Sequence, residues 1–250
     1  MTLCLAWVER DRRIVALSDR RSSVAGTNVD VVAKVHTFPQ TNMLMMWEGN
    51  TAAAKQVVDA IRNLFLTQPG LDCRTAPASE IIESTLLRIN EFWDGIHIEP
   101  IRGIDTKPKA DELSFILGAY DYEADRPLLT RVGRESDNQP WVANDCSTHL
   151  GSVHQPFFAI GDKSTVIDDY SEGKGVLLAS TLGDALRDAI RQGVTVGGIP
   201  QVVTLDRRGS VEFGVERDGV RYVGGYSISK EAKVDRMIRF VEYENLIPKL

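Results

Sequence analysis

The order in which short apolar runs alternate with amphipathic segments constrains the fold of this chain more than any other feature. The first block holds two apolar runs, residues 2–8 and 13–18, joined by a short charged turn. Short apolar runs bounded by turn signals are typical of buried strands, so this pair predicts a hairpin. A polar linker over residues 20–30 then precedes a second predicted strand pair at 31–37 and 43–47.

Two helical patterns follow these strands. Apolar side chains recur three and four positions apart in residues 51–67, and residues 79–94 repeat the same spacing. This periodicity gathers the apolar side chains on one face, as in a helix that lies on a sheet. The next apolar runs, at 113–120, 127–132 and 157–161, again predict strands.

The C-terminal part repeats this alternation. The expected elements are helices near 164–171 and at 179–192, and strands at 200–206, 210–216 and 219–223. The chain then ends in a predicted helix over about residues 229–247, for which Ser229 is the expected N-cap.

Strand blocks that alternate with helix pairs favour an α+β fold in which two packed antiparallel sheets are covered outside by helices, a four-layer αββα sandwich. The length of 250 residues is compatible with one large domain, and neither a linker nor an internal repeat divides the sequence. We therefore predict a single domain over residues 1–250.

Composition and charge narrow the function. The formal net charge of −6 comes without a basic stripe, so nucleic acid is not a predicted partner. No apolar stretch has the length of a membrane span, and residues 1–15 lack the zones of a signal peptide, so we predict a cytoplasmic protein without membrane association. The cysteines Cys4, Cys73 and Cys146 are odd in number and far apart, which argues against a disulfide framework or a zinc site.

Motifs for cofactors are also missing from the sequence. Among the four histidines, only His149 and His154 come near a ligand spacing, and we read them as ordinary surface or core residues. The serines lack the nucleophile elbow of serine hydrolases, and no glycine-rich segment has the Walker spacing. Neither a metal nor a cofactor is predicted.

The residue after the initiator methionine points to a specific chemistry. Loss of Met1, which is usual before a residue as small as threonine, leaves Thr2 with a hydroxyl and a free α-amine. A threonine hydroxyl needs a base, and an α-amine with a reference pKa near ~8 can serve. A lysine ammonium would favour the neutral amine, a carboxylate would hold that lysine, and a glycine amide would stabilise an oxyanion. Lys34, Asp19 and Gly49 can fill these three roles.

These residues together resemble the proteasome β-subunit group of N-terminal-nucleophile hydrolases. The matching segments are Thr2 with its apolar strand, residues 16–20, residues 33–35, and Gly49 before an alanine-rich helix start. The spacing from Thr2 to Lys34 agrees with the family, and Asp19 fits if the first hairpin turn is one residue longer. Among bacterial branches, the opening residues and the Ser-Asp-x-Arg pattern are most similar to Anbu, the ancestral β-subunit proteins.

The resemblance implies a threonine-type amide hydrolase that acts on peptides or small amides within a self-compartmentalising homo-oligomer, either a ring or an open helical ring. An unfoldase partner stays undetermined. By the same resemblance, Thr2 is nucleophile and base, and Lys34 tunes the amine. Asp19 holds the lysine, and the Gly49 amide receives the oxyanion.

Further positions follow from the resemblance, with some departures from the family pattern. It gives substrate contacts to Arg20 and Met46, whereas the apolar residues around Met46 by themselves indicate a place in the core. The family's supporting serine falls where either Asp162 or Ser164 can stand in. Thr195 is the one hydroxyl ahead of the later double glycine, and the family's aspartate is missing there. These departures keep a second hypothesis open, a catalytically silent proteasome-like protein with a structural or binding role.

Overall fold

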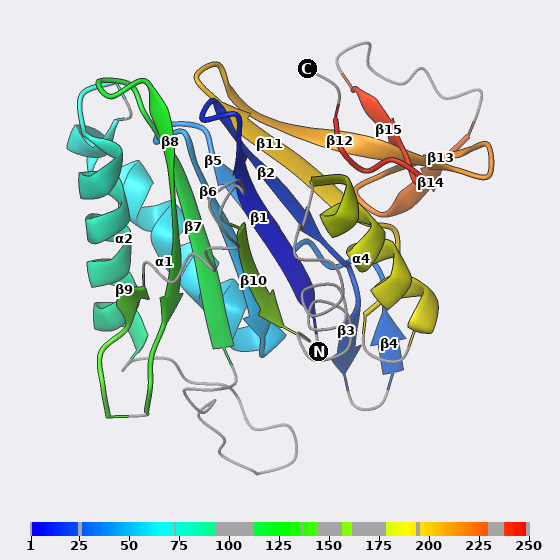
Figure 1. Ribbon diagram of the computed structural model, residues 1–250. Helices are drawn as coiled ribbons and strands as arrows, with labels where there is room; N and C mark the ends of the chain where they lie inside the picture. Colours follow the sequence, from blue (N-terminus) through cyan, green and yellow to red (C-terminus); the bar gives the residue numbers. More distant parts are fainter. Residues whose placement is uncertain are drawn as a thin grey trace.

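The chain folds into an α+β structure with mostly antiparallel sheets, seen in a computed structural model (Figure 1). The residues that the structure describes are 2–24, 27–72, 74–93, 113–136, 138–144, 157–161, 179–193, 196–229 and 238–248.

The larger sheet contains both the first and the last strands of the chain. Its strands are β1 (Leu3–Glu9), β2 (Arg13–Ser18), β10 (Phe157–Gly161), β11 (Gln201–Asp206), β12 (Gly209–Arg217), β13 (Val220–Val223), β14 (Tyr226–Ile228) and β15 (Phe240–Glu242). They pair in the order β10-β1-β2-β11-β12-β13-β14, and β15 pairs with β12. Every pair is antiparallel except β12–β15. The start of β1 is thus flanked by the end of β2 and the end of β10.

The second sheet pairs its strands in chain order, and a small hairpin stands apart from both sheets. The second sheet consists of β5 (Val35–Phe38), β6 (Met43–Gly49), β7 (Leu113–Asp121), β8 (Arg126–Gly133) and β9 (Val142–Asn144), all antiparallel. The hairpin consists of β3 (Ser22–Val24) and β4 (Thr27–Val29), and it occupies the segment predicted as a polar linker.

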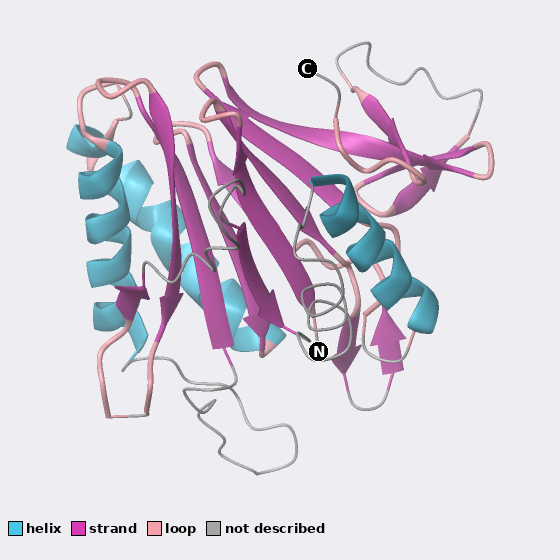
Figure 2. Ribbon diagram, in the orientation of Figure 1, coloured by secondary structure: helices cyan, strands magenta, loops and turns pink. Residues whose placement is uncertain are grey.

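Three α-helices lie within the described residues, and they cover the outer sides of the two sheets (Figure 2). They are α1 (Thr51–Thr67), α2 (Ala78–Trp93) and α4 (Ala179–Gln192). Asn50 caps α1, because its side chain accepts the amides of Ala52 and Ala53 at 3.0 and 3.1 Å. Of the helices described, none combines the length and the apolar character that a membrane crossing requires.

Three clusters of buried apolar side chains follow this arrangement. One joins α1 and α2 to the second sheet, and another joins α4 to the larger sheet. The third fills the space between the sheets, with Cys4 and Ala6 of β1 on one side and Leu44 and Met46 of β6 on the other. Because successive side chains of a strand point to opposite faces, residues 2 to 7 alternate between this inter-sheet space and the face below α4.

The predicted helix over residues 229–247 is wrong in its described part. Residues 238–248 contain β15 and a turn, while 230–237 lie outside the described residues. Val241, which lies within this predicted helix, instead pairs with Val215 in a parallel strand. The apolar spacing is compatible with either element, and pairing with a strand distant in sequence decides between them.

The other predicted elements agree in type with the structure, apart from some boundaries. The strand predicted at 31–37 begins only at Val35, which leaves Lys34 in the preceding loop. The helix predicted near 164–171 lies outside the described residues.

Candidate active site

The structure brings together three of the predicted site residues, Thr2, Asp19 and Lys34. Thr2 directly precedes β1 and Asp19 directly follows β2, so the antiparallel pairing of these strands places the two residues side by side. The Asp19 amide donates to the Leu3 carbonyl at 3.2 Å. Lys34 comes from the other sheet, just before β5. All three side chains are buried.

Gln201, a buried residue of β11, fixes the main chain around Lys34. Its Oε1 accepts the amides of Lys34 and Val35, both at 3.0 Å, and its Nε2 donates to the Val35 carbonyl at 2.9 Å. The Lys34 carbonyl also accepts the amide of Trp47 at 3.2 Å. The lysine is therefore held from both sheets at once.

The Lys34 ammonium has a full set of partners. Its Nζ donates to Thr2 Oγ1 at 2.6 Å, to Asp19 Oδ1 at 2.8 Å and to the carbonyl of Arg21 at 2.5 Å. Three donors meet three acceptors, which compensates for the burial of the charge. The arrangement directs one ammonium hydrogen at the Thr2 hydroxyl oxygen.

Asp19 receives N–H groups from several directions. Its Oδ1 accepts the amide of Leu3 at 3.0 Å, and its Oδ2 accepts the amides of Arg21 at 3.0 Å and Gly197 at 3.3 Å. Burial raises the pKa of the Asp19 carboxyl, whereas the Lys34 charge and these hydrogen bonds act in the opposite direction. Because every partner is a donor, the ionised carboxylate is the form that this environment satisfies.

The thiol of Cys4 lies next to this network and is a poor nucleophile. Cys4 is fully buried, and its Sγ donates to the Trp47 carbonyl at 3.4 Å. Burial raises the pKa of the Cys4 thiol well above its ordinary value. A buried protonated thiol is inert, so the hydroxyl of Thr2 is the better candidate nucleophile.

Two glycines near the site have left-handed backbone angles. Gly49 ends β6 with φ of 101°, and Gly161 ends β10 with φ of 103°. A Cβ on Gly161 would lie only 1.6 Å from the Thr2 carbonyl oxygen, so no larger residue fits there. Gly49 is exposed, and its role as oxyanion donor stays a prediction.

The remaining predicted residues fall into two groups. Arg20 is buried and pairs with Glu212 of β12, and Met46 is buried between the sheets. Substrate binding by these two residues stays a prediction. Ser164 and Thr195 lie outside the described residues.

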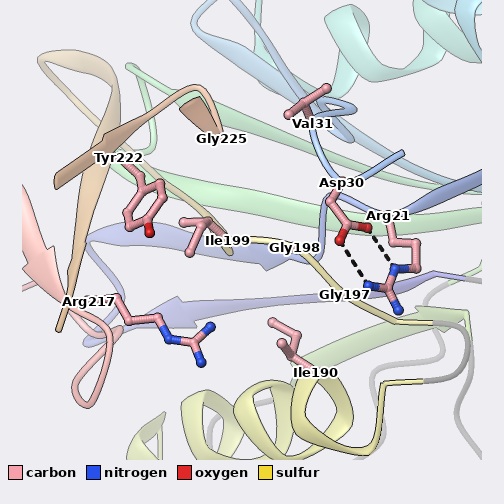
Figure 3. Close-up of a pocket in the computed structure, with 10 residues that line it drawn as sticks. All are labelled: Arg21, Asp30, Val31, Ile190, Gly197, Gly198, Ile199, Arg217, Tyr222 and Gly225. Carbon is pink, nitrogen blue, oxygen red and sulfur yellow. Dashed lines mark hydrogen bonds and ion pairs between the residues drawn. The ribbon is translucent and has the colours of Figure 1, made fainter. Parts of the chain in front are cut away.

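A pocket of about 390 Å³ adjoins the network (Figure 3). The residues that line it are Arg21, Asp30, Val31, Ile190, Gly197, Gly198, Ile199, Arg217, Tyr222 and Gly225. Two of them belong to the network, because the Arg21 carbonyl accepts from Lys34 and the Gly197 amide donates to Asp19. The Arg21 side chain is held by Asp30 through Nε at 2.7 Å and Nη2 at 2.9 Å. A Cβ on Gly197 would lie 2.2 Å from Arg21 Cζ, so a larger residue there would displace the Arg21 side chain.

Sequence reasoning missed three contributors to this site, Arg21, Gly197 and Gln201. The arginine of the Ser-Asp-x-Arg pattern and the double glycine were visible signals for the first two. No local pattern distinguishes Gln201, whose role arises between the sheets. Within the described part of the chain, no three His, Cys, Asp or Glu side chains are arranged to hold a metal ion.

Comparison with known proteins identifies the fold but not the activity. The sequence matches no family model and no curated protein. Among solved structures, Anbu from Hyphomicrobium sp. strain MC1 matches with a TM-score of 0.58 and 17% identity, over 92% of this chain and 89% of that chain. Its Gly-1 mutant matches with a TM-score of 0.58 and 18% identity, over 93% of this chain and 89% of that chain. Anbu (ancestral beta-subunit) from Yersinia bercovieri matches with a TM-score of 0.60 and 13% identity, over 84% of this chain and 86% of that chain.

The fold is the proteasome-like fold of Anbu. The likeness covers 84–93% of this chain and 86–89% of the Anbu chains. At identities of 13–18%, the likeness shows the fold alone. The chemistry available to this Anbu-like chain depends on its own residues.

Proposed function

We propose that this chain is a threonine-type amide hydrolase, with Thr2 as its N-terminal residue after loss of Met1. The observation that carries the proposal is the buried Lys34 ammonium, 2.6 Å from Thr2 Oγ1 and 2.8 Å from Asp19 Oδ1. A lysine placed this way stabilises negative charge that develops on the hydroxyl oxygen during attack. Its positive charge also favours the neutral, basic form of the nearby α-amine.

In the proposed reaction, Thr2 Oγ1 attacks the carbonyl carbon of an amide, and the hydroxyl proton passes to the α-amine of the same residue. The amine then gives that proton to the leaving nitrogen as the C–N bond breaks, which leaves an ester on Thr2. Water attacks the ester carbonyl, and its proton returns through the amine, so the hydroxyl is restored and a carboxylic acid leaves. Asp19 keeps Lys34 in place throughout.

We propose the Gly49 amide as donor to the oxyanion of both tetrahedral intermediates. Gly49 supports this role because it ends a strand in a left-handed conformation and is exposed. The proposed substrates are peptides or small amides, with Arg20 and Met46 contributing to substrate binding. Ser164 and Thr195 are proposed as supporting hydroxyls for the amine.

We further propose a single domain with a four-layer αββα architecture that works in a self-compartmentalising homo-oligomer. The three clusters of apolar side chains, one between the sheets and one under each helical layer, support the layered architecture. Native mass spectrometry of the purified chain tests the assembly. A protein that is monomeric at all concentrations would contradict it.

Intact-mass measurement with an N-terminal-threonine-directed epoxyketone tests the chemistry. We expect Met1 to be absent and one adduct to form on Thr2, because the reagent needs both the hydroxyl and the free amine. The T2A and K34A variants should form none. The matched variant T27A, on an exposed strand, should react like the wild-type chain.

Two results would count against hydrolase function. If Met1 is absent and the wild-type chain still forms no adduct, the geometry does not activate Thr2. If Met1 is retained, the amine is blocked and cannot be the base. That second result would favour the alternative, a catalytically silent proteasome-like protein with a structural or binding role.

A further inference from the structure

Glu48 reaches the candidate site from the opposite sheet. On β6, Leu44 and Met46 belong to the cluster between the sheets, and Glu48 continues the same alternation at the end of the strand. Cys4 belongs to that cluster too, and its thiol bonds to the Trp47 carbonyl. The end of β6 therefore lies against the start of β1, with the Glu48 carboxylate directed into the space between the sheets.

The Glu48 carboxylate is anchored and lies near the Thr2 carbonyl. Ser114, which is opposite Glu48 in the β6–β7 register, donates its Oγ hydrogen to Glu48 Oε1 at 2.8 Å. The other oxygen, Oε2, lies 3.1 Å from the position that a Gly161 Cβ would occupy, and the Thr2 carbonyl oxygen lies 1.6 Å from that same point. The distance between Glu48 Oε2 and the Thr2 carbonyl oxygen is therefore no more than the sum of these two distances.

Strand geometry places the Thr2 nitrogen on this same edge. In an extended chain the N–H and C=O of one residue point to one side, and those of the next residue point to the other. Both main-chain groups of Leu3 face Asp19, through bonds of 3.0 and 3.2 Å. Continuing this alternation by one residue predicts that the nitrogen and carbonyl of Thr2 face β10, and the position of the Thr2 carbonyl next to Gly161 is consistent with it. An α-amine on Thr2 is thereby directed toward Gly161 and Glu48.

We propose that Glu48 is a positioning residue for the Thr2 α-amine. Its carboxylate accepts a hydrogen bond from an N–H group of the amine, and Ser114 holds the carboxylate in place. This inference rests on the proposed function, since it requires Thr2 to be the N-terminal residue. Glu48 thereby supplies a partner for the amine from within the described residues. In the family pattern, the groups that support the amine come from other positions, which this sequence alters. No sequence motif marked Glu48, because its neighbours in the site come from β1, β7 and β10.

The charges around the amine act in opposite directions. Lys34, from the loop before β5, favours the neutral amine, while Glu48 of β6 favours the ammonium. Asp19, after β2, also favours the ammonium but is paired with Lys34. The Cys4 thiol of β1 is protonated and adds no charge. With Glu48 present, the amine can hold the proton that it takes from the Thr2 hydroxyl until the leaving group needs it.

Competitive acetylation tests this role without depending on catalysis. The protein is treated with trace acetic anhydride at a series of pH values, and the modified N-terminal peptide is quantified by mass spectrometry. In the E48Q variant we expect the pKa of the Thr2 amine to fall by about one unit, because a neutral amide no longer stabilises the ammonium. S114A should shift it less in the same direction, and E48D should retain most of the wild-type value.

The matched control is E91Q, the same substitution in an exposed ion pair on α2. It should leave the amine pKa unchanged. In parallel, the low-pH limb of epoxyketone adduct formation should move to lower pH in E48Q and stay in place in E91Q. A merely structural role for Glu48 would lower the thermal midpoint without moving either titration.

An amine pKa in E48Q equal to that of wild-type and E91Q protein would overturn the inference, while adduct formation on wild-type Thr2 would leave the proposed function intact. Conversely, suppose that the amine pKa shifts in E48Q while the wild-type chain never forms the adduct. This result would support the contact and refute the hydrolase. If E48Q does not fold, S114A decides, because an unchanged amine pKa in that variant contradicts the role.

Discussion

Replacing Lys34 with methionine tests the energetics of the buried ion pair. The substitution keeps most of the length of the side chain but removes the ammonium that bonds to Thr2, Asp19 and the Arg21 carbonyl. The side chains of Lys34 and Asp19 are only 1% and 0% exposed, so water cannot take the place of the lost partner. Removing one member of such a pair costs about 3–5 kcal/mol, and we expect K34M to lose stability in this range near neutral pH.

The loss should depend on pH in a defined direction. Burial already raises the pKa of Asp19 in the folded protein, and removal of Lys34 takes away the charge that opposed this rise. A carboxyl whose folded pKa exceeds its unfolded value of about 3.9 stabilises the fold when protonated. That contribution is complete below the unfolded pKa and is lost as the pH rises through the folded pKa. The deficit of K34M relative to wild type should therefore shrink as the pH falls through this window.

Urea unfolding, followed by the fluorescence of the four tryptophans, measures both effects at one fixed protein concentration. The matched control is K55M, which removes an exposed lysine on α1 and should change stability by less than about 0.5 kcal/mol. A loss below about 1 kcal/mol for K34M would show that the pair contributes little, contrary to the expected cost of an unpaired buried charge. A deficit that stays constant or grows at low pH would show that Asp19 does not take up the proton.

Two further predictions concern backbone fit and a partly buried imidazole. In G161A the new methyl group meets the Thr2 carbonyl, so we expect the epoxyketone adduct to be lost and the thermal midpoint to fall. G209A, also at positive φ but in open space, should keep the adduct, and equal loss in both would point to strain alone. Burial lowers the pKa of His36 to about 4, and Trp47 Nε1 donates to its Nε2 at 3.2 Å. Its NMR signals should therefore stay those of neutral imidazole on acidification through pH 6.5. The stability that the neutral imidazole contributes should be present above the unfolded pKa and fall as the pH drops toward about 4. A titration midpoint near 6.5 would contradict this.

Local patterns in the sequence were sufficient for most of the elements. β1 and β2 are predicted by short apolar runs bounded by turn signals, because both faces of these strands are buried. α1 and α2 are predicted by apolar residues three and four positions apart, because one face of each helix is buried. The same logic failed for residues 238–248, where Val241 joins a parallel strand beside β12. Parallel pairing leaves no local mark in the sequence, and short apolar segments fit either element.

The candidate site divides in the same way. The available chemistry follows from residue types alone, because a threonine after Met1, a lysine and an aspartate have defined reactivity. That these three side chains meet depends on tertiary packing, through the pairing of β1 with β2 and the bridge of Gln201 between the sheets. The same packing places Glu48 beside Thr2, since residues of different sheets become neighbours only when the sheets pack face to face.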